Sequence, residues 1–459
     1  MTPLQQFEKL NNAPNLDLEL RIKRLKSLKS TISTYSSAIV EALNEDYGRR
    51  SESETKIAEI LICIEEIKHT LQNINSWVKP QVSYASYKFM FSKNALVPQP
   101  LGVVGIISPW NYPFNLAIDP LIAAIAAGNK VMLKPSEITP KTSQLMSDML
   151  AEVFLDTEVA VVLGGLEVAQ QFSALPFKHI LFTGSSAVGK IIMQAAANNL
   201  TPVTLELGGK SPVIIDEKYN IKTAAKSIVA GKFFNAGQTC IAPDYILVNE
   251  NQQQPLIDAL KIELNKCFAD VLNNRDYTAI INNNHYERLS KLAKNCETNG
   301  QCIWPLGNKK IDDINLFPPL LVINPDINSH IMQSEIFGPI LPILTVKSCD
   351  DAISIINSQP NPLTLYLFSN RSRVIKKVLK QTLSGSAAIN ETLVQFAQDG
   401  IPFGGVGESG MGSYHGKKGF MNFSHVKSIY YQTRLNFNSM VRAPFTPIKK
   451  IIIKFMSSS

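Results

Sequence analysis

The chain has 459 residues, of which 45% are hydrophobic and 18% are charged. This composition excludes an intrinsically disordered chain, and the length exceeds the ~250–300 residues that one core usually serves, so we expect two or three domains. The net charge of +7 is spread over 45 basic and 38 acidic residues without a basic block rich in aromatics, which argues against a nucleic-acid-binding protein.

Targeting and redox features are also sparse. The segment MTPLQQFEKLNNAPN lacks the basic and then apolar pattern of a signal peptide, and no apolar run is long enough for a membrane span. The six cysteines are scattered without a C-x-x-C pair, which argues against a zinc ribbon and against a disulfide framework. We therefore expect a cytoplasmic protein whose thiols are mostly buried and inert.

The N-terminal part predicts two amphipathic helices. In the first, apolar residues recur at steps of three and four over 25–39, and Gly48 marks its end. In the second, Ser51 and Glu54 resemble a capping box before an isoleucine-rich stripe over 57–74. Neither helix carries a chemical motif, so we expect both to pack against a core.

Short apolar runs then predict a parallel sheet. Residues 79–96 are rich in Tyr and Phe and indicate a strand or hairpin. The apolar runs that follow lie at 101–108, 130–135, 159–165, 179–185, 202–209 and 212–216. Helical segments separate several of them, at 114–127, 140–154 and 187–198. Strand and helix alternating at this spacing are typical of a parallel, Rossmann-type sheet that is covered on both faces.

Ligands of such sheets bind beyond the carboxyl ends of the strands, so the polar residues that end each run are candidate site residues. These ends lie at 108–111, 134–137, 183–189 and 206–209. A weaker repeat of the pattern runs from 210 to about 410 and predicts a second α/β domain. Its candidate strands lie at 322–325, 340–346 and 363–369.

Several common motifs are absent. There is no H-E-x-x-H and no His/Cys cluster, so we expect no metal site, and there is no G-x-S-x-G nucleophile elbow. The segment GSSAVGK at 184–190 matches the start of a P-loop, but Ile191 stands where a P-loop NTPase needs a hydroxyl for magnesium. The segment is either an ordinary tight turn or a loop that places phosphate at a helix N-terminus.

Cys240 differs from the other cysteines because small and polar residues surround it, in FNAGQTC. A reactive cysteine needs local positive potential to form the thiolate. The nearest histidines in sequence are His179 and His285, so a cysteine–histidine pair of the protease type is not indicated. A lone cysteine is usually inert, and only the surrounding motif favours a reactive role.

Three other residues leave two interpretations open. Glu206 ends an apolar strand, where a carboxylate is either paired structurally or serves as a general base with a raised pKa. Glu335 is either a solvated loop residue or part of a site. Asn111 either caps the helix that follows it or takes part in chemistry.

Seven segments in a fixed order resemble the aldehyde dehydrogenase superfamily over about residues 20–430. They are PWNYPF (109–114), KPSE (134–137), FTGS with GK (182–190), TLELGGKSP (204–212), GQTC (237–240), EIFGP (335–339) and PFGGVGESGMG (402–412). The last motif and GQTCIAPDYIL are similar to the class 3 branch. The segments LGVVGIISPWNYPF and SALPFKHILFTGS are similar to the bacterial coniferyl aldehyde dehydrogenase subgroup of that branch.

The resemblance implies catalytic roles for three residues. Cys240 would attack the aldehyde carbon to form a thiohemiacetal, and Asn111 would donate a hydrogen bond to the developing oxyanion. Hydride loss to the nicotinamide would leave a thioester, and Glu206 would deprotonate the water that hydrolyses it.

The resemblance also implies how a cofactor binds. Lys134 and Glu137 would hold the adenosine ribose, and a carboxylate at Glu137 favours NAD over NADP, although the class 3 branch often accepts both. The pyrophosphate would contact Gly184, Ser185 and Gly189. The nicotinamide ribose would contact Glu335 and Phe337. Ser186 departs from the family pattern, where Thr is common, and the glycine pattern is not G-x-G-x-x-G.

The resemblance further implies a fold with an NAD(P)-binding domain, a catalytic domain and oligomerisation segments that make a homodimer. The expected bounds are 1–78 with 97–204, 205–410, and 79–96 with 421–440 respectively, followed by a basic and apolar tail at 441–459. The tail is too short and too rich in lysine to span a membrane, so it is solvated, packs on a subunit or weakly contacts a membrane surface. The substrate is either an aromatic aldehyde such as coniferyl aldehyde or a medium- or long-chain aliphatic one. A P-loop-like NTPase and a catalytically silent binding protein on the same fold are the alternatives.

Overall fold

The structure is a computed structural model that describes residues 1–83, 92–298, 302–307, 314–434 and 442–457. Its N-terminal part is helical. The elements are α1 (Pro3–Asn12), α2 (Leu18–Thr34), α3 (Ser36–Tyr47), α4 (Glu52–Thr55), the π-helix η1 (Lys56–Leu61) and α5 (Ile62–Trp77). The prediction of two helices was therefore too simple. The first divides at Tyr35, the second contains the π-helix, and α1 was not predicted.

The first sheet has six strands in the order β15-β7-β6-β3-β4-β5, and all pair in parallel except β15 with β7. The strands are β3 (Val103–Ile107), β4 (Lys130–Lys134), β5 (Val159–Val161), β6 (Ile180–Thr183), β7 (Val203–Glu206) and β15 (Gly410–Met411). The first five predicted runs each contain one of these strands, which confirms the parallel sheet.

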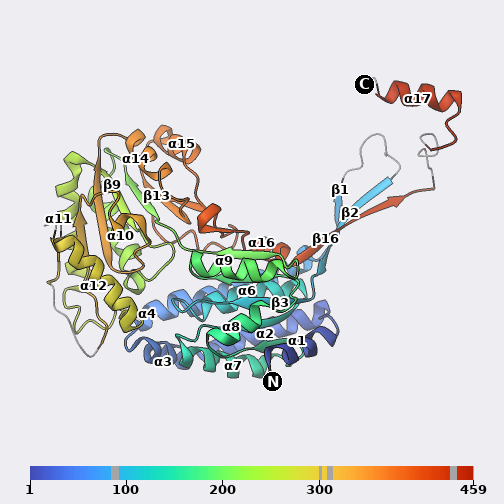
Figure 1. Cartoon of the computed structure of the whole chain (residues 1–459), viewed down its shortest axis with the longest axis horizontal. Coiled ribbons are helices and arrows are strands. Elements are labelled where there is room, and N and C mark those ends of the chain that lie inside the picture. Colours follow the sequence, from blue (N-terminus) through green and yellow to red (C-terminus); the bar gives the residue numbers. More distant parts are fainter. Residues whose placement is uncertain (84–91, 299–301, 308–313, 435–441, 458–459) are drawn as a thin grey trace.

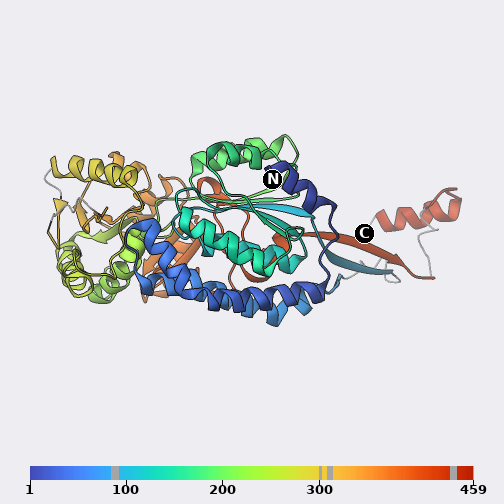
Figure 2. The ribbon, with the colours of Figure 1, turned by 90° about the horizontal axis from the view of Figure 1, so that it is seen from below.

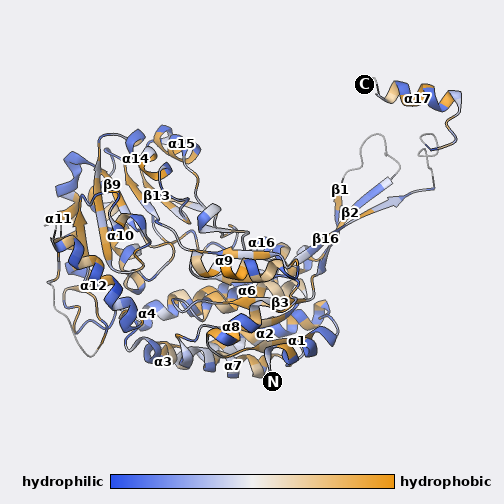
Figure 3. Ribbon diagram, in the orientation of Figure 1, coloured by the Kyte–Doolittle hydropathy of each residue, from blue (hydrophilic) through white to orange (hydrophobic). Residues whose placement is uncertain are grey.

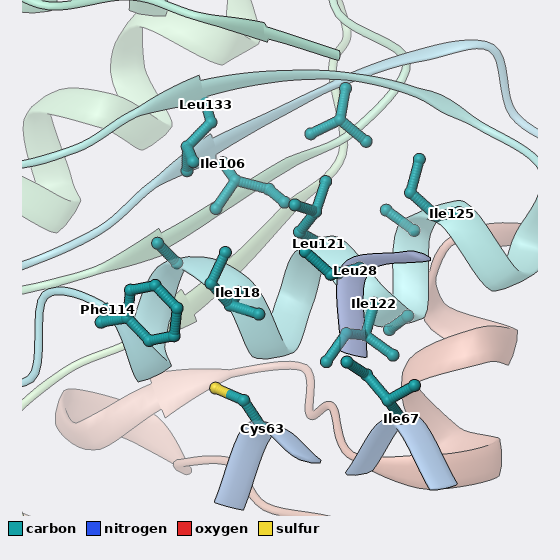
Figure 4. Packing of buried hydrophobic residues seen from close by; sticks show 14 of the residues in the cluster. Leu28, Cys63, Ile67, Ile106, Phe114, Ile118, Leu121, Ile122, Ile125 and Leu133 are labelled. Atoms are coloured by element: carbon teal, nitrogen blue, oxygen red, sulfur yellow. The ribbon is translucent and has the colours of Figure 1, made fainter. Parts of the chain in front are cut away.

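Helices cover this sheet and make its core. They are α6 (Asn115–Ala127), α7 (Pro140–Val153), α8 (Leu166–Ser173), α9 (Ser186–Ala197) and α16 (Gly416–Asn422). Every residue of α6 is buried, as expected for a helix in which all residues except Asn115 and Asp119 are apolar. Figure 4 shows α6 between the strands that carry Ile106 and Leu133 and the helices that carry Leu28 and Ile67.

The second sheet has seven strands in the order β10-β11-β12-β9-β8-β13-β14, and only the β10–β11 pair is antiparallel. The strands are β8 (Pro212–Ile215), β9 (Tyr245–Asn249), β10 (Cys302–Ile303), β11 (Leu320–Ile323), β12 (Ile340–Val346), β13 (Thr364–Phe368) and β14 (Ser386–Ile389). Run 212–216 thus belongs to this sheet. Its helices are α10 (Ile221–Phe233), α11 (Glu250–Phe268), α12 (Asn283–Thr298), α13 (His330–Gln333), α14 (Cys349–Asn357) and α15 (Ser372–Gln381), with short 3₁₀ turns η3 (Phe234–Gly237) and η4 (Gly407–Ser409) elsewhere.

A third, antiparallel sheet projects from the body, as Figures 1 and 2 show. It consists of β1 (Gln81–Ser83), β2 (Ser92–Pro100) and β16 (Ser424–Gln432), in the order β1-β2-β16. The hairpin predicted for 79–96 agrees with the pairing of β1 and β2, while residues 84–91 lie outside the described residues.

The chain continues beyond this sheet to α17 (Pro447–Ser457), which carries both apolar and polar side chains (Figure 3). Within the described ranges, no helix is both long and apolar enough to cross a membrane.

Candidate active site

A crevice opens where the strand order of the first sheet reverses. From β3 the chain builds β4 and β5 on one side of the sheet, and it then returns to build β6 and β7 on the other side. The loops that follow β3 and β6 therefore diverge, and ligands of open α/β sheets bind at such a point. A cavity of about 400 Å³ lies there, lined by Pro109–Asn111 after β3 and by Thr183–Ser185 at the end of β6.

Seven of the ten predicted site residues line this cavity. They are Asn111, Gly184, Ser185, Glu206, Cys240, Glu335 and Phe337. Lys134, Glu137 and Gly189 do not line it. Lys134 ends the neighbouring strand β4, and its Nζ lies 3.1 Å from Glu137 Oε2. Gly189 lies in the first turn of α9, where a Cβ would come within 2.7 Å of the Leu207 side chain, so it serves close packing of helix on strand.

The loop that carries Cys240 is strained and buried. It follows η3, in which Asn235 and Ala236 both have left-handed backbone angles with φ of 51°. Non-glycine residues adopt such angles only where surrounding contacts hold them. The Cys240 thiol itself is partly exposed. Burial, followed by the Glu335 and Glu206 carboxyls, raises its pKa to about 12.

Asn111 does not cap the helix that follows, which settles one of the two interpretations of this residue. The side-chain amide of Asn111 donates instead to the Gln238 carbonyl at 3.1 Å, in the Cys240 loop. The first N–H groups of α6 are capped by a distant carboxylate, Glu59 Oε2, which accepts from Phe114 N at 3.2 Å and Asn115 N at 2.8 Å. The Asn111 amide is thereby left beside the thiol loop.

Glu206 ends β7 and is fully enclosed. Its two carboxylate oxygens have no hydrogen-bond partner among the described residues. Burial raises the pKa of this carboxyl well above its usual range. Of the two interpretations left open by its sequence context, a structurally paired carboxylate does not fit, whereas a carboxyl with a raised pKa does.

Two buried charges hold the loop that carries Glu335. Lys210 contacts Asp244 and donates to the Ile331 and Ser334 carbonyls at 2.9 and 3.0 Å. Asp244 in turn accepts from Ile336 N at 3.1 Å. The loop is thus fixed on both sides of Glu335.

Glu335 lies close to the backbone of the motif that follows Glu206. A Cβ on Gly208 would come within 1.9 Å of Glu335 Oε2, so only glycine fits at that position. Burial, followed by the Asp244 carboxylate, raises the pKa of Glu335 to about 8. The backbone N–H of Gly209 and the cations of Lys210 and Arg288 oppose this shift.

The cavity has the features that a dinucleotide needs. Ser185 lines the cavity and is the N-cap of α9, with its Oγ accepting from Val188 N at 3.4 Å, so α9 begins at the crevice. A helix N-terminus of this kind favours phosphate. Lys190 and Ile191 are exposed on α9, so the lysine of the GSSAVGK segment does not face the crevice.

A second cavity, of about 210 Å³, lies on the other side of Cys240. Cys240 and Leu116 line both cavities. The rest of its lining is almost entirely apolar, namely Ile57, Ala58, Ile62, Tyr112, Asn115, Phe234, Thr239, Ile241, Leu393, Val394, Phe396 and Ala397. Ile57 and Val394 keep 53% and 47% of their surface exposed, so the outer end of the cavity meets solvent.

Sequence reasoning missed the aromatic and basic side chains on the far side of the first cavity. Trp110 packs against His285 and Phe337, with ring centroids 4.7 and 5.4 Å apart. Arg288, one turn further along α12, donates to the Ile336 and Phe337 carbonyls at 2.7 and 3.3 Å. α12 carries no motif, and only its packing against the EIFGP loop reveals it. His179 lies elsewhere, in contact with Thr204.

No cluster of three or more metal-ligating side chains occurs in the part of the chain that the structure describes. The site instead combines a thiol, a buried carboxyl without a partner, and a crevice at a switch point. This combination is typical of an oxidoreductase that uses a dinucleotide and forms a covalent intermediate.

Comparison with known proteins gives the family. The aldehyde dehydrogenase family matches residues 7–429. A probable coniferyl aldehyde dehydrogenase of Pseudomonas aeruginosa is 42% identical over 445 residues, covering 96% of this chain and 92% of the relative. A 4,4'-diaponeurosporen-aldehyde dehydrogenase of Staphylococcus aureus is 44% identical over 428 residues, covering 93% and 92%. The solved structure named the substrate bound state of Staphylococcus aureus AldH has a TM-score of 0.94 at 41% identity and covers 99% of both chains.

The chain therefore belongs to the aldehyde dehydrogenase family, as its motifs predicted. It is an NAD(P)-dependent oxidoreductase that converts an aldehyde to the acid. Neither the P-loop NTPase nor the catalytically silent binding protein is supported.

Proposed function

We propose that the chain oxidises apolar aldehydes with NAD, with Cys240 as the nucleophile, Asn111 as the oxyanion donor and Glu206 as the general base. The single observation that carries this proposal is that these three residues line one cavity. Attack of the Cys240 sulfur on the aldehyde carbon gives a thiohemiacetal whose oxygen the Asn111 amide stabilises, an interaction typically worth about 3–4 kcal/mol.

An oxidised nicotinamide bound in this cavity would supply the hydride acceptor, so that the thiohemiacetal on Cys240 becomes a thioester. Glu206 would then take a proton from a water molecule, and this water would attack the thioester carbon, releasing the acid and the Cys240 sulfur. A carboxyl with a raised pKa and no fixed partner suits that task. The residues proposed to hold the cofactor are Lys134 and Glu137 for the adenosine ribose, Gly184 and Ser185 for the pyrophosphate, and Glu335 with Phe337 for the nicotinamide ribose.

The substrate class follows from the second cavity. Its lining offers few polar groups, and the Tyr112 hydroxyl already bonds to Thr239 Oγ1 at 2.6 Å. Against the apolar part of this lining, a phenol hydroxyl such as that of coniferyl aldehyde would lose its hydration, a cost that a hydrocarbon chain does not incur. Medium- and long-chain aldehydes therefore fit this lining better than aromatic aldehydes that carry a hydroxyl, although three relatives are named coniferyl or probable coniferyl aldehyde dehydrogenases.

The preference for NAD rests on Glu137. Its side chain is about half exposed beside the buried Lys134 ammonium. NADP carries a 2′-phosphate on the adenosine ribose, and this phosphate would face the Glu137 carboxylate and be repelled.

The proposal includes a homodimer in the cytoplasm. The third sheet carries exposed side chains away from the body, and among the described residues its outer strands β1 and β16 each pair on one side only, which favours pairing with a second copy. The scattered cysteines, none of them in a disulfide, are in keeping with a reducing compartment. We propose that α17 contacts the second subunit, and weak attachment of α17 to a membrane surface is the alternative.

One set of assays tests substrate and cofactor together. We expect kcat/KM to rise along a series from butanal to decanal, by roughly fourfold for each methylene that enters the apolar cavity, and to be lower for coniferyl aldehyde than for decanal. The kcat/KM with NAD should exceed the kcat/KM with NADP, and Glu137→Gln should reduce the ratio of these two values. Highest activity with coniferyl aldehyde would refute the substrate assignment, and an unchanged cofactor ratio in Glu137→Gln would refute the role of Glu137.

A further inference from the structure

The backbone carbonyl of Asn111 accepts three hydrogen bonds from buried side chains. Tyr47 Oη donates at 3.0 Å, an N–H of the Arg50 guanidinium at 3.1 Å, and the Asn235 amide at 3.0 Å. All three donors are at most 4% exposed, so water does not compete for them. Two of them, Tyr47 and Arg50, come from the end of α3 and the turn after it, remote in sequence from the residue they hold.

Arg50 is itself held by Glu59. Arg50 Nη2 lies 2.9 Å from Glu59 Oε1, and both side chains are fully buried. The other oxygen of Glu59 caps Phe114 and Asn115 at the start of α6, as described above. The ion pair therefore spans the PWNYPF segment. It holds the Asn111 carbonyl through Arg50 and the residues that follow through Glu59.

The Cys240 loop is tied to the same N-terminal segment. Glu54 Oε2 accepts from Asn235 N at 3.0 Å, and the Asn111 amide completes the connection by donating to Gln238 O. The strained residues before Cys240 and the proposed oxyanion donor Asn111 are thus held by the same N-terminal segment. A buried ion pair adds little net stability compared with apolar packing, so stability alone does not account for this one.

We propose that the Arg50–Glu59 ion pair, together with Tyr47, is a positioning clamp that holds the Asn111 side chain at the oxyanion position beside Cys240. The inference rests on the proposed function, because it acts through the proposed role of Asn111. None of the three clamp residues lines either cavity, so none is a catalytic residue.

The clamp also connects Asn111 with the wall of the apolar cavity on the other side of the Cys240 thiol. Glu59 lies in the π-helix η1, and its neighbours Ile57 and Ala58 line the apolar cavity. One turn of wide helix therefore contacts both the capped start of α6 and the wall of the substrate cavity. π-helical turns of this kind are frequent at functional sites.

A double-mutant cycle tests the clamp. Arg50→Lys keeps the charge but loses the guanidinium N–H group that donates to the Asn111 carbonyl. We expect kcat to fall by about 10- to 100-fold, because small displacements of a reacting group cost this much. The KM for the aldehyde and the Kd for NAD should stay within about twofold. In an Asn111→Ala background, Arg50→Lys should lower kcat by less than about twofold further, because residues that act through one another are not additive.

The control is Arg24→Lys, since Arg24 forms a comparable ion pair with Glu158, at 2.7 Å, away from both cavities. It should leave kcat unchanged. Should Arg50→Lys fail to fold, Tyr47→Phe removes a single donor and enters the same cycle, with the same non-additivity expected. Equal losses in both backgrounds would overturn the clamp and leave the role of Asn111 standing. An unchanged kcat in Asn111→Ala alone would overturn both.

Discussion

The thiol of Cys240 lies beside two buried carboxyl groups. Burial raises the pKa of this thiol, and the carboxyls of Glu335 and Glu206 raise it further. Sequence reasoning expected local positive potential, which a reactive thiolate needs. We therefore expect the thiol to stay protonated until positive charge enters the cavity, so the chain alone keeps its nucleophile unreactive.

Glu206 allows the sharpest test at the scale of a single residue. In Glu206→Gln the thioester should still form but hydrolyse slowly, because the amide cannot take a proton from water. Rapid mixing should show a burst of NADH close to one per active site, followed by a steady rate lowered by about 10²-fold or more. Glu167→Gln, at an exposed position of α8, is the matched control. An unaltered steady rate in Glu206→Gln would remove this residue from the mechanism.

The elements show where periodicity stops being informative. Tyr35 continued the apolar stripe of the first predicted helix, yet it is the residue at which α2 ends and α3 begins. Ile57 continued the stripe of the second helix, yet it is 53% exposed. The π-helix that starts at Lys56 changes the residues per turn, so a stripe drawn at 3.6 residues per turn fails there.

The projecting sheet is the element that predicts assembly. Within the described part of the chain, β16 pairs with β2 on one side only, and its Tyr430 and Tyr431 are about half exposed. We expect the protein to sediment as a dimer, at twice the chain mass of 50.7 kDa. Tyr431→Glu should raise the dimer dissociation constant by about tenfold or more, because it desolvates a charge in the interface.

The control for this prediction is Ile262→Glu. Ile262 is 67% exposed on α11, at the end of the molecule opposite the projecting sheet (Figure 1), and its substitution should leave the dimer intact. Sedimentation of the unmodified protein as a monomer at micromolar concentration would contradict the prediction.

Over the whole molecule, the residues that line the crevice were more readily predicted than the residues that hold them in place. The short apolar runs located the first sheet, and the polar ends of those runs included Asn111, Gly184 and Glu206. Nothing in the sequence connected Glu59 with Asn111, or Ile57 with Phe396, because each pair joins segments that only the fold brings together. Supporting contacts of this kind leave no local pattern.

One buried lysine should lower the free energy of unfolding by an amount that depends on pH. Lys232 is fully buried, and its ammonium has no hydrogen-bond partner among the described residues. Burial lowers its pKa from 10.5 to about 8. Between pH 8 and 10.5 the unfolded chain binds more protons at this residue, so its contribution to the free energy of unfolding rises with pH over that window.

Replacing this lysine should therefore stabilise the protein most at neutral pH. In Lys232→Met the free energy of unfolding at pH 7 should increase by up to about 3 kcal/mol, since each pKa unit is worth ~1.4 kcal/mol. The gain over the unmodified protein should shrink as the pH approaches 10.5. Urea unfolding of both proteins at pH 7 and pH 10 measures this, and a gain that does not vary with pH would contradict it.

Cys240 forms part of the wall between the two cavities, and this has a consequence for inhibition. A hydrocarbon that fills the apolar side reaches the sulfur without entering the crevice at the switch point. Such a compound would compete with the aldehyde, yet raising the NAD concentration would not displace it. The hydrocarbon and NAD would then be able to bind in either order, because each enters through a different cavity.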